Sequence, residues 1–436
     1  MRYVPPKTPA DGSSTPLAQR DGVAFHLEVG EEGEVRVPEE ERRRWGLAPG
    51  SKLSIKQTPA GLLLRPADPP LMKVYVEPTN GCNLSCRTCV RNSWSEPAGI
   101  MPMDSYRRLI DGLREVPSLR KISFWGFGEP LLHPSIVEMV AMAKRLGVET
   151  QVITNALLLD KERAEGLVAA GLDSLVVSID GASAETYSEV RPGADLDLVR
   201  HNVGLLRAAR RSSPRHSPEI GIEFVAMKSN LGELRGLPRL ARSLAASFIV
   251  LTNVLPYTEE LKDEILYWLS AGRSIPAIRS KWWPEISLPV MDIRRDTFGP
   301  LLELLAHSAV PDSPQIRFDA TAGYCRFVNE GSAVVAWDGE VSPCVALMHS
   351  YPCYVIGRKK QIRRYSLGNV VKEDVANIWG RYEFVRFRDL VQRFDFPPCT
   401  GCGGCNLADS NEEDCFGNSF PVCGDCLWAK GVIQCP

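Results

Sequence analysis

The sequence lacks any apolar run of about 20 residues, which is the length that a helix needs to span a bilayer. It also lacks a positively charged N-terminal region followed by an apolar core, as a secretory signal has. Neither sign of charge is in excess, because 51 Lys and Arg residues stand against 53 Asp and Glu residues. We therefore expect a cytoplasmic protein with no membrane association and no overall attraction to nucleic acid.

Cysteine is absent from the long stretch between Cys89 and Cys325, although the chain has 13 cysteines. Three of them are Cys82, Cys86 and Cys89, and ten fall between Cys325 and Cys435. The reducing cytoplasm disfavours disulfides. This distribution therefore predicts two separate metal-binding regions.

The first group follows an apolar run and has the spacing Cys82-x3-Cys86-x2-Cys89. A structural zinc site normally needs four ligands, and a disulfide framework needs an even count in a small secreted chain. Three thiolates on a 4Fe–4S cluster instead leave one iron open to another ligand. The triplet therefore predicts an iron-sulfur cluster with an open iron.

Residues 74–89 resemble the radical S-adenosylmethionine (SAM) superfamily, with Thr88 at a position that is often aromatic there. The resemblance implies that SAM chelates the open iron of the cluster held by Cys82, Cys86 and Cys89. It also implies that SAM is reductively cleaved to methionine and a 5′-deoxyadenosyl radical, which abstracts hydrogen from a substrate. We expect the electron to come from a ferredoxin or flavodoxin.

Strand patterns alternate with helical patterns in residues 71–255. The predicted strands are 73–76, 121–125, 149–153, 174–178, 221–226 and 248–251. The predicted helices are 103–113, 134–146, 160–170, 196–210 and 231–244. Repeated alternation predicts a parallel sheet with helices outside. With the resemblance, six such units predict an α/β fold built on a partial (β/α)6 TIM-like radical SAM barrel.

Candidate SAM-binding residues follow the predicted strands, where barrel enzymes hold their active sites. The family carries a Gly-Gly-Glu-Pro motif whose backbone and carboxylate hold the amino group of SAM. Here its place is taken by Gly126, Phe127, Gly128, Glu129 and Pro130. By resemblance, contacts to the ribose and carboxylate of SAM come from Asn155, Ser178, Asp180, Arg191 and Glu223. Helix capping or turn formation is the alternative for Asn155, Ser178 and Asp180.

The spacing Cys325-x13-Gly339-x4-Cys344 resembles the opening of a SPASM-type extension, which carries auxiliary iron-sulfur clusters. The other candidate ligands are Cys399, Cys402, Cys405, Cys415, Cys423, Cys426 and Cys435. Without the isolated Cys353, nine cysteines remain, and two clusters need eight thiolates. The later spacing departs from common SPASM members, so the ligand sets stay unassigned. A zinc ribbon formed by the Cys-x2-Cys pairs at 399 and 423 is the alternative.

The remaining segments complete the predicted domain organisation. Residues 1–20 are predicted to be a flexible tail, 256–320 a helical insertion or linker, and 321–436 the SPASM-like domain. Residues 21–68 show short runs in which apolar and polar residues alternate. The sequences of residues 33–38 and 45–53 resemble the AbrB-type swapped-hairpin domain. That resemblance implies a homodimer. DNA binding is disfavoured, because seven cationic residues are balanced by seven acidic ones in residues 22–66.

Segments 89–94, 253–260 and 423–429 together resemble the tungsten cofactor oxidoreductase radical SAM maturase family. The resemblance implies a radical SAM enzyme that matures a tungsten-dependent oxidoreductase or its cofactor. One alternative is a radical SAM/SPASM enzyme that modifies a peptide or protein. Another is an AbrB-like DNA-binding redox regulator. The sequence leaves the modified atom open.

Overall fold

A computed structural model describes most of the chain beyond residue 67. The described residues are 28–29, 31, 34–39, 42, 47, 53–58, 61–66, 68–214, 216–272, 277–280, 285–306, 316–319, 324–402 and 405–435. The tail expected at residues 1–20 lies outside them. None of the helices within these ranges is long and apolar enough to cross a membrane.

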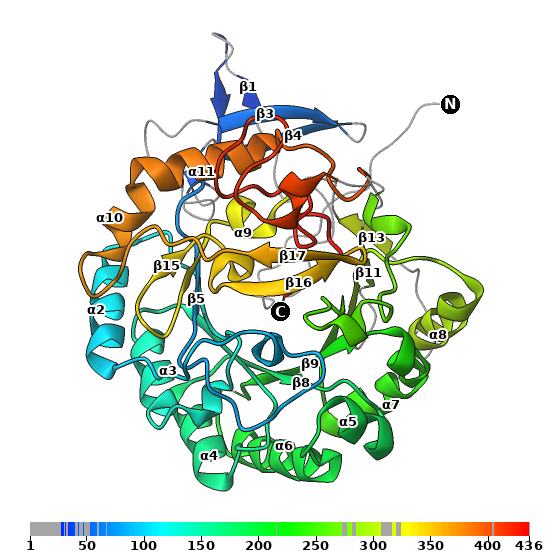
Figure 1. Cartoon of the computed structure of the whole chain (residues 1–436). Helices are drawn as coiled ribbons and strands as arrows, with labels where there is room; N and C mark the ends of the chain where they lie inside the picture. Colours follow the sequence, from blue (N-terminus) through cyan, green and yellow to red (C-terminus); the bar gives the residue numbers. More distant parts are fainter. Residues whose placement is uncertain are drawn as a thin grey trace, which may run out of the picture.

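A mostly parallel sheet forms an arc at the centre of the molecule (Figure 1). Its six central strands are β5 (Lys73–Val76), β6 (Lys121–Phe124), β7 (Glu149–Thr154), β8 (Ser174–Ser178), β9 (Glu219–Ala226) and β10 (Phe248–Asn253). Neighbours along the chain are parallel neighbours in the sheet. The six predicted strands and the α/β class are confirmed, and the strand order is that of an open sheet.

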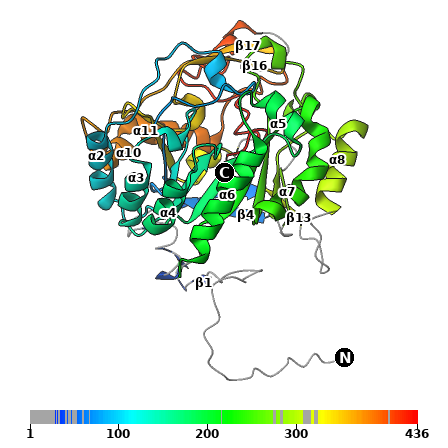
Figure 2. The same cartoon turned by 90° about the horizontal axis from the view of Figure 1, so that it is seen from below.

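Helices cover the outer face of this arc (Figures 1 and 2). They are α2 (Met103–Arg114), α3 (Ile136–Lys144), α4 (Lys161–Ala170), α5 (Ala184–Val190), α6 (Leu196–Arg211) and α7 (Leu237–Leu244). The predicted helix at 231–244 is divided, because the 3-10 helix η3 (Lys228–Gly236) precedes α7. Carboxylate caps fix two helix starts: Asp160 accepts from Arg163 N before α4, and Asp195 caps α6.

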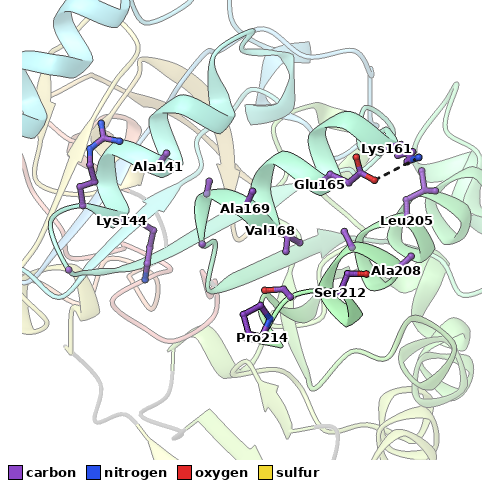
Figure 3. A pocket seen from close by; sticks show the side chains of 16 residues that line it. Ala141, Lys144, Lys161, Glu165, Val168, Ala169, Leu205, Ala208, Ser212 and Pro214 are labelled. Carbon is purple, nitrogen blue, oxygen red and sulfur yellow. Dashed lines mark ion pairs between the residues drawn. The ribbon is translucent and has the colours of Figure 1, made fainter.

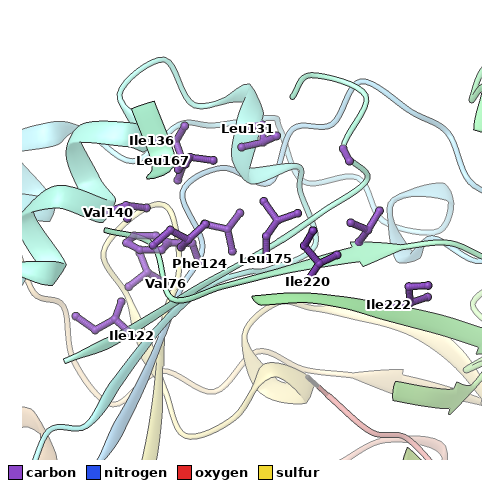
Figure 4. Packing of buried hydrophobic residues seen from close by; sticks show 14 of the residues in the cluster. Val76, Ile122, Phe124, Leu131, Ile136, Val140, Leu167, Leu175, Ile220 and Ile222 are labelled. Carbon is purple, nitrogen blue, oxygen red and sulfur yellow. The ribbon is translucent and has the colours of Figure 1, made fainter. Parts of the chain in front are cut away.

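The main core lies between the sheet and these helices. Figure 4 shows strand residues such as Val76, Phe124 and Leu175 packing near helix residues such as Val140 and Leu167. All five are fully buried. Parallel strands that are covered on both faces are expected to be apolar runs, as these are. The core fixes the strand ends, and with them the loops that follow each strand.

Residues 256–320 differ from the predicted helical insertion. They contain η4 (Glu259–Leu261), η5 (Ser270–Gly272), β11 (Ala277–Ser280), β12 (Glu285–Leu288), α8 (Arg295–Ala306) and β13 (Ile316–Asp319). β12 pairs in parallel with β10, and β11 and β13 continue the sheet in antiparallel fashion. The helical prediction is wrong for these strands, because β12 satisfies the free backbone groups at the edge of β10 and β11 and β13 then pair in turn beyond it.

The C-terminal region extends the other edge of the sheet through β14 (Ser332–Val335), which pairs in parallel with β5. Its further elements are α9 (Arg326–Asn329), β15 (Val341–Ser342), η6 (Val345–Leu347), β16 (Tyr351–Val355), β17 (Arg358–Ile362), α10 (Val375–Gly380), α11 (Tyr382–Arg393) and η7 (Asn406–Asp409). The last described residues lie beside the carboxyl end of β10, where Gln434 N donates to Thr252 Oγ1 at 2.9 Å. There Asn253 Nδ2 donates a hydrogen bond to Val432 O at 2.8 Å.

Two antiparallel hairpins represent the N-terminal region among the described residues. One pairs β1 (Glu28–Val29) with β2 (Val35–Arg36), and the other pairs β3 (Leu53–Thr58) with β4 (Gly61–Pro66). The predicted β structure is therefore present. The AbrB-type domain and its dimerisation remain predictions.

Candidate active site

The loop with Cys82, Cys86 and Cys89 begins after β5 and leads into the 3-10 helix η1 (Val90–Asn92). Its start is held by Asn80, whose Oδ1 accepts from Gly99 N at 2.7 Å. Asn80 Nδ2 also donates to Pro97 O at 3.0 Å. The three thiols thus lie beyond the carboxyl end of the first parallel strand, where the sequence placed them.

The charges around these thiols suit thiolate ligands. Burial raises the pKa of Cys82, Cys86 and Cys89 above the ordinary thiol value. The positive charge of Arg191 acts against this effect at Cys86 and Cys89, and that of Arg91 does so at Cys82 and Cys89. Iron-sulfur clusters are held by thiolates. The two cations therefore favour the ionised form that a cluster requires.

Gly126 and Gly128 lie directly against the start of the cysteine loop. A Cβ at Gly128 would be 2.0 Å from Thr79 O and 2.6 Å from Gly81 O. A Cβ at Gly126 would be 2.4 Å from Glu77 Cγ. Neither position has room for a side chain. The turn at 126–128 therefore packs bare backbone directly against the start of the cysteine loop; its binding of SAM remains a prediction.

Phe127 separates the two glycines without disturbing this close approach. Its ring centroid lies 5.7 Å from that of Trp94 and 5.9 Å from those of His349 and Tyr351. Such separations are typical of favourable aromatic contacts. The departure from the family's double glycine therefore adds a contact with the C-terminal region.

Glu129 ties this turn to the end of β7, just before the 3-10 helix η2 (Pro130–Leu132). Glu129 Oε1 accepts from Thr154 Oγ1 at 2.6 Å, and Oε2 accepts from Asn155 N at 2.8 Å. Burial raises the pKa of Glu129 despite these donors. Asn155 Nδ2 lies 3.8 Å from Cys82 Sγ. The turn, the end of β7 and the cysteine loop are thus joined in one network.

Asp180 and Arg191 form a buried ion pair after β8. Arg191 Nε donates to Asp180 Oδ2 at 2.9 Å, and the side chains are 9% and 0% exposed. Asp180 Oδ1 also accepts from Val225 N at 3.0 Å. The positive charge of Arg191 acts to lower the pKa of Cys86, so the ion pair holds a fixed positive charge beside the cysteine loop. Asp180 therefore positions Arg191 instead of capping a helix.

Ser178 and Glu223 lie on the neighbouring strands β8 and β9, where Ser178 Oγ donates to Glu223 Oε2 at 3.1 Å. Burial raises the pKa of Glu223 to about 7. The negative charge of Glu223 also acts on Cys435, whose thiol accepts from Trp428 Nε1 at 3.3 Å. Cys435 is therefore close enough to Glu223, a predicted SAM contact, for their charges to interact.

Three further site residues were not expected from the sequence. His349 Nε2 lies 2.8 Å from Glu77 Oε2, and His349 Nδ1 lies 2.6 Å from Glu96 Oε2. Glu77 lies within residues 74–89, the segment that resembles the family, and this is the one signal that the sequence offered. His133, which follows η2, is also buried, and its Nε2 lies 3.0 Å from Met101 O.

The C-terminal cysteines form two groups that the sequence did not separate. The first group lines a cavity of about 190 Å³ and consists of Cys399, Cys402, Cys405 and Cys415. Three cysteines of the second group line a cavity of about 50 Å³ and are Cys344, Cys423 and Cys426. Cys325 lies in the same buried cluster as these three cysteines, and its charge also interacts with each of them. Four thiolates in each group match the requirement of one cluster.

A buried ion pair lies between the two groups, since Lys360 and Asp425 line both cavities at an Nζ–Oδ2 distance of 2.7 Å. Cys353 also lines the smaller cavity.

Among the described residues, no three Cys, His, Asp or Glu side chains converge on one metal-ion position. In a cluster each thiolate binds a different iron, so its ligands surround a volume instead of a point.

A large surface hollow of about 1120 Å³ lies elsewhere, between α3, α4 and α6 (Figure 3). Ala141, Glu165 and Ala208 are among its lining residues. Gly147 and Gly171, which precede β7 and β8, also line it. The hollow therefore lies toward the amino ends of these strands, away from the cysteine loop.

Comparison with known proteins identifies the family. Residues 76–216 match the model of the radical SAM superfamily, and residues 325–406 match that of an iron-sulfur cluster-binding domain named SPASM. A tungsten-containing aldehyde ferredoxin oxidoreductase cofactor-modifying protein of Pyrococcus furiosus is 30% identical over 83% of this chain and 96% of its own length. The chain belongs to the radical SAM superfamily.

A further relative and two solved structures are also similar to this chain. A PqqA peptide cyclase of Gluconobacter oxydans is 29% identical over 81% of this chain and 90% of its own length. The structure of anSMEcpe with bound AdoMet has a TM-score of 0.51 at 17% identity, covering 83% of this chain and 96% of that one. Streptococcus suis SuiB bound to its precursor peptide has a TM-score of 0.51 at 16% identity, covering 80% and 72%. These structural likenesses support the fold.

As a radical SAM enzyme with a SPASM domain, the protein uses a 4Fe–4S cluster, SAM and auxiliary iron-sulfur clusters. The residues present fit these groups. Three free thiols share one loop with two neighbouring cations, and both glycines of the adjacent turn leave backbone bare. The C-terminal domain adds four cysteines around one cavity and, in a second buried cluster, Cys325 with Cys344, Cys423 and Cys426.

Proposed function

We propose that this radical SAM enzyme matures a tungsten-dependent oxidoreductase or its cofactor. The main support is the Pyrococcus furiosus relative, which is named for modifying the cofactor of a tungsten-containing aldehyde ferredoxin oxidoreductase. The likeness extends over 370 residues, well beyond the segment that matches the superfamily model. A shared substrate class is the simplest reading of a likeness that covers nearly the whole relative.

In this proposal Cys82, Cys86 and Cys89 hold the cluster and leave one iron open to SAM. When bound, the cluster and SAM together supply a 5′-deoxyadenosyl radical that can abstract hydrogen from a substrate. The 126–128 turn offers its backbone to the amino group of SAM. Arg191, fixed by Asp180, offers a positive charge to the SAM carboxylate.

The other predicted contacts complete the SAM site. Asn155 reaches the cysteine loop from the end of β7 and is a candidate contact for the SAM ribose or carboxylate. Ser178 and Glu223 share a hydrogen bond inside the arc and are further candidates. Pro130 begins η2 and holds the turn in place.

The two groups of four C-terminal cysteines are proposed to hold two auxiliary clusters. A ferredoxin or flavodoxin would donate the electron. We also propose a homodimer formed through the N-terminal region, because short hairpins leave strand edges that a second chain can cover. Sedimentation of the whole chain and of a chain lacking residues 1–68 tests this, since a monomeric whole chain contradicts it.

Modification of a peptide or protein is the second candidate function. The PqqA peptide cyclase relative supports it at 29% identity over 81% of this chain. The tungsten proposal has the fuller match, because the Pyrococcus furiosus relative is covered over 96% of its length and the cyclase over 90%. Both candidates have a protein or a protein-bound cofactor as substrate.

Deletion of the gene tests the proposed function. In the deletion strain we expect tungsten oxidoreductase activity to be lost, to return with the wild-type gene, and to stay absent with Cys82→Ala. Immunoblotting of the oxidoreductase controls for its synthesis. Undiminished activity in the deletion strain would refute the maturase role. A gel-shift experiment at low salt tests separately whether the protein is a DNA-binding regulator, and the absence of binding would exclude that role.

A further inference from the structure

A buried histidine joins three distant segments beside the predicted SAM-binding turn. His349 is fully buried, and each of its ring nitrogens faces a carboxylate oxygen, one from Glu77 and one from Glu96. When both carboxylates are ionised they only accept hydrogen bonds, so both ring nitrogens then donate. In that state His349 is an imidazolium held between two acids. These acids come from the end of β5 and from the segment after the cysteine motif.

Each of the two carboxylates also accepts a hydrogen bond from a backbone N–H group. Glu77 Oε1 accepts from Phe127 N at 3.0 Å, so its carboxylate holds the 126–128 turn. Glu96 Oε1 accepts from Ser350 N at 3.3 Å, which fixes the segment after the cysteines to the C-terminal region. The His349 ring also packs edge-on against Trp94, with centroids 4.8 Å apart. One side chain of the C-terminal region thus touches both sides of the predicted SAM site.

We propose that His349 is a positioning residue for SAM, acting through Glu77 on the 126–128 turn and through Glu96 on the segment after the cysteine loop. This inference rests on the part of the proposed function that places SAM beside this turn. It does not depend on the tungsten substrate. Both ring nitrogens of His349 are occupied by the two acids, so its loss should weaken SAM binding more than it slows the bound reaction.

The bridge should depend on pH. Burial alone would lower the pKa of His349, but the hydrogen bonds and charges of Glu77 and Glu96 raise it to about 9. The nearby charges are those of Arg364 and Asp338, which pair with each other at 2.7 Å. Because the folded pKa exceeds the unfolded value of 6.5, the stabilisation is complete below about 6.5 and is lost as pH rises through about 9.

Glu96 sets the acid limit of the pH range in which the bridge is intact. Burial would raise its pKa, but the hydrogen bond and charge of His349 lower it below 4.5. Its stabilisation is therefore present above 4.5 and is lost as pH falls through the lowered value. Between these limits the bridge is intact, so the KM for SAM should be lowest there.

The experiment measures kcat and KM for 5′-deoxyadenosine formation by the reconstituted full-length enzyme with dithionite, from near-neutral to alkaline pH. His349→Gln is expected to raise the KM for SAM about tenfold near neutral pH with kcat changed less than about twofold. In the wild type the KM should rise above pH 9, and in His349→Gln it should not. Glu96→Gln should move that rise to lower pH, because one of two charged partners is removed.

Glu138→Gln is the matched control, because this surface glutamate lies on α3 and its side chain is 52% exposed. It should behave as the wild type. The unfolding temperature gives a readout independent of turnover, and should fall through pH 9 in the wild type but not in His349→Gln. If His349→Gln does not fold, the shift of the KM rise in Glu96→Gln decides between the outcomes. The Glu96 side chain is 28% exposed, so this variant is expected to fold.

An unchanged KM in the folded variants, or an alkaline rise that persists in His349→Gln, would overturn the positioning role. An equal loss of kcat and kcat/KM would also overturn it, because that pattern belongs to a residue that acts in the chemical step. These outcomes are distinct from failure of the maturase proposal. That failure would leave SAM cleavage intact and spare tungsten-enzyme activity in the deletion strain.

Discussion

Replacing Gly128 by alanine tests whether the predicted SAM-binding turn must lie directly on the cysteine loop. The new Cβ would be 2.0 Å from Thr79 O and 2.6 Å from Gly81 O. Carbon-oxygen contacts of this kind need about 3.3 Å, so the turn and loop must separate by roughly 1 Å. Both obstructing atoms are backbone oxygens, so rotation of a side chain cannot relieve the overlap.

A misplacement of about 1 Å can cost about 100-fold in rate, and overpacking costs about 1–3 kcal/mol. We therefore expect Gly128→Ala to lower kcat/KM for SAM cleavage about 100-fold and the free energy of unfolding by about 1–3 kcal/mol. Gly204→Ala is the control, because its Cβ in α6 would meet no atom within 4 Å. It should keep full activity and gain about 0.5–1 kcal/mol.

The assay is 5′-deoxyadenosine formation by anaerobically reconstituted enzyme, with denaturant unfolding measured in parallel. Iron content shows whether each variant retains its clusters. If Gly128→Ala holds its iron and has kcat/KM within about twofold of the wild type, the close approach of turn and loop is not needed for SAM binding. The reasoning from the glycines would then be wrong.

Three further predictions concern the cysteines and the buried ion pair. Cys82→Ala should abolish SAM cleavage under dithionite, and persistent 5′-deoxyadenosine would contradict the assignment of the loop. Cys344→Ala and Cys402→Ala should each lose about four irons per chain, whereas Cys353→Ala should lose none; an equal loss in Cys353→Ala would overturn the two groups. Asp180→Asn should cost about 3–5 kcal/mol of unfolding free energy, because it leaves a buried guanidinium without its charged partner; a cost below about 1 kcal/mol would mean that solvent screens the pair.

The fold of residues 71–255 could be predicted because its strands and helices repeat with clear periods. The strands at 277–280 and 285–288 could not, because their structure is decided by the pairing of 285–288 with the edge of β10 and of 277–280 with 285–288. Short segments of this kind carry no distinctive period of their own. Their structure is set by tertiary contacts.

The candidate site divides in the same way. The cysteine loop and the 126–128 turn are local motifs, and the structure brings them into contact as expected. His349 escaped notice because its partners Glu77 and Glu96 are far away in the sequence. The cysteine groups escaped for a related reason. One group includes residues on both sides of the other along the chain, so spacing alone cannot separate them.

The most direct test of the central claim uses immature tungsten oxidoreductase purified from the deletion strain. The reconstituted enzyme is incubated with this protein, SAM and dithionite, and 5′-deoxyadenosine and oxidoreductase activity are measured together. We predict that the immature protein accelerates SAM cleavage and gains activity in proportion to it, and that Cys82→Ala gives neither result. Cleavage at an unchanged rate with no gain of oxidoreductase activity would contradict the proposed function.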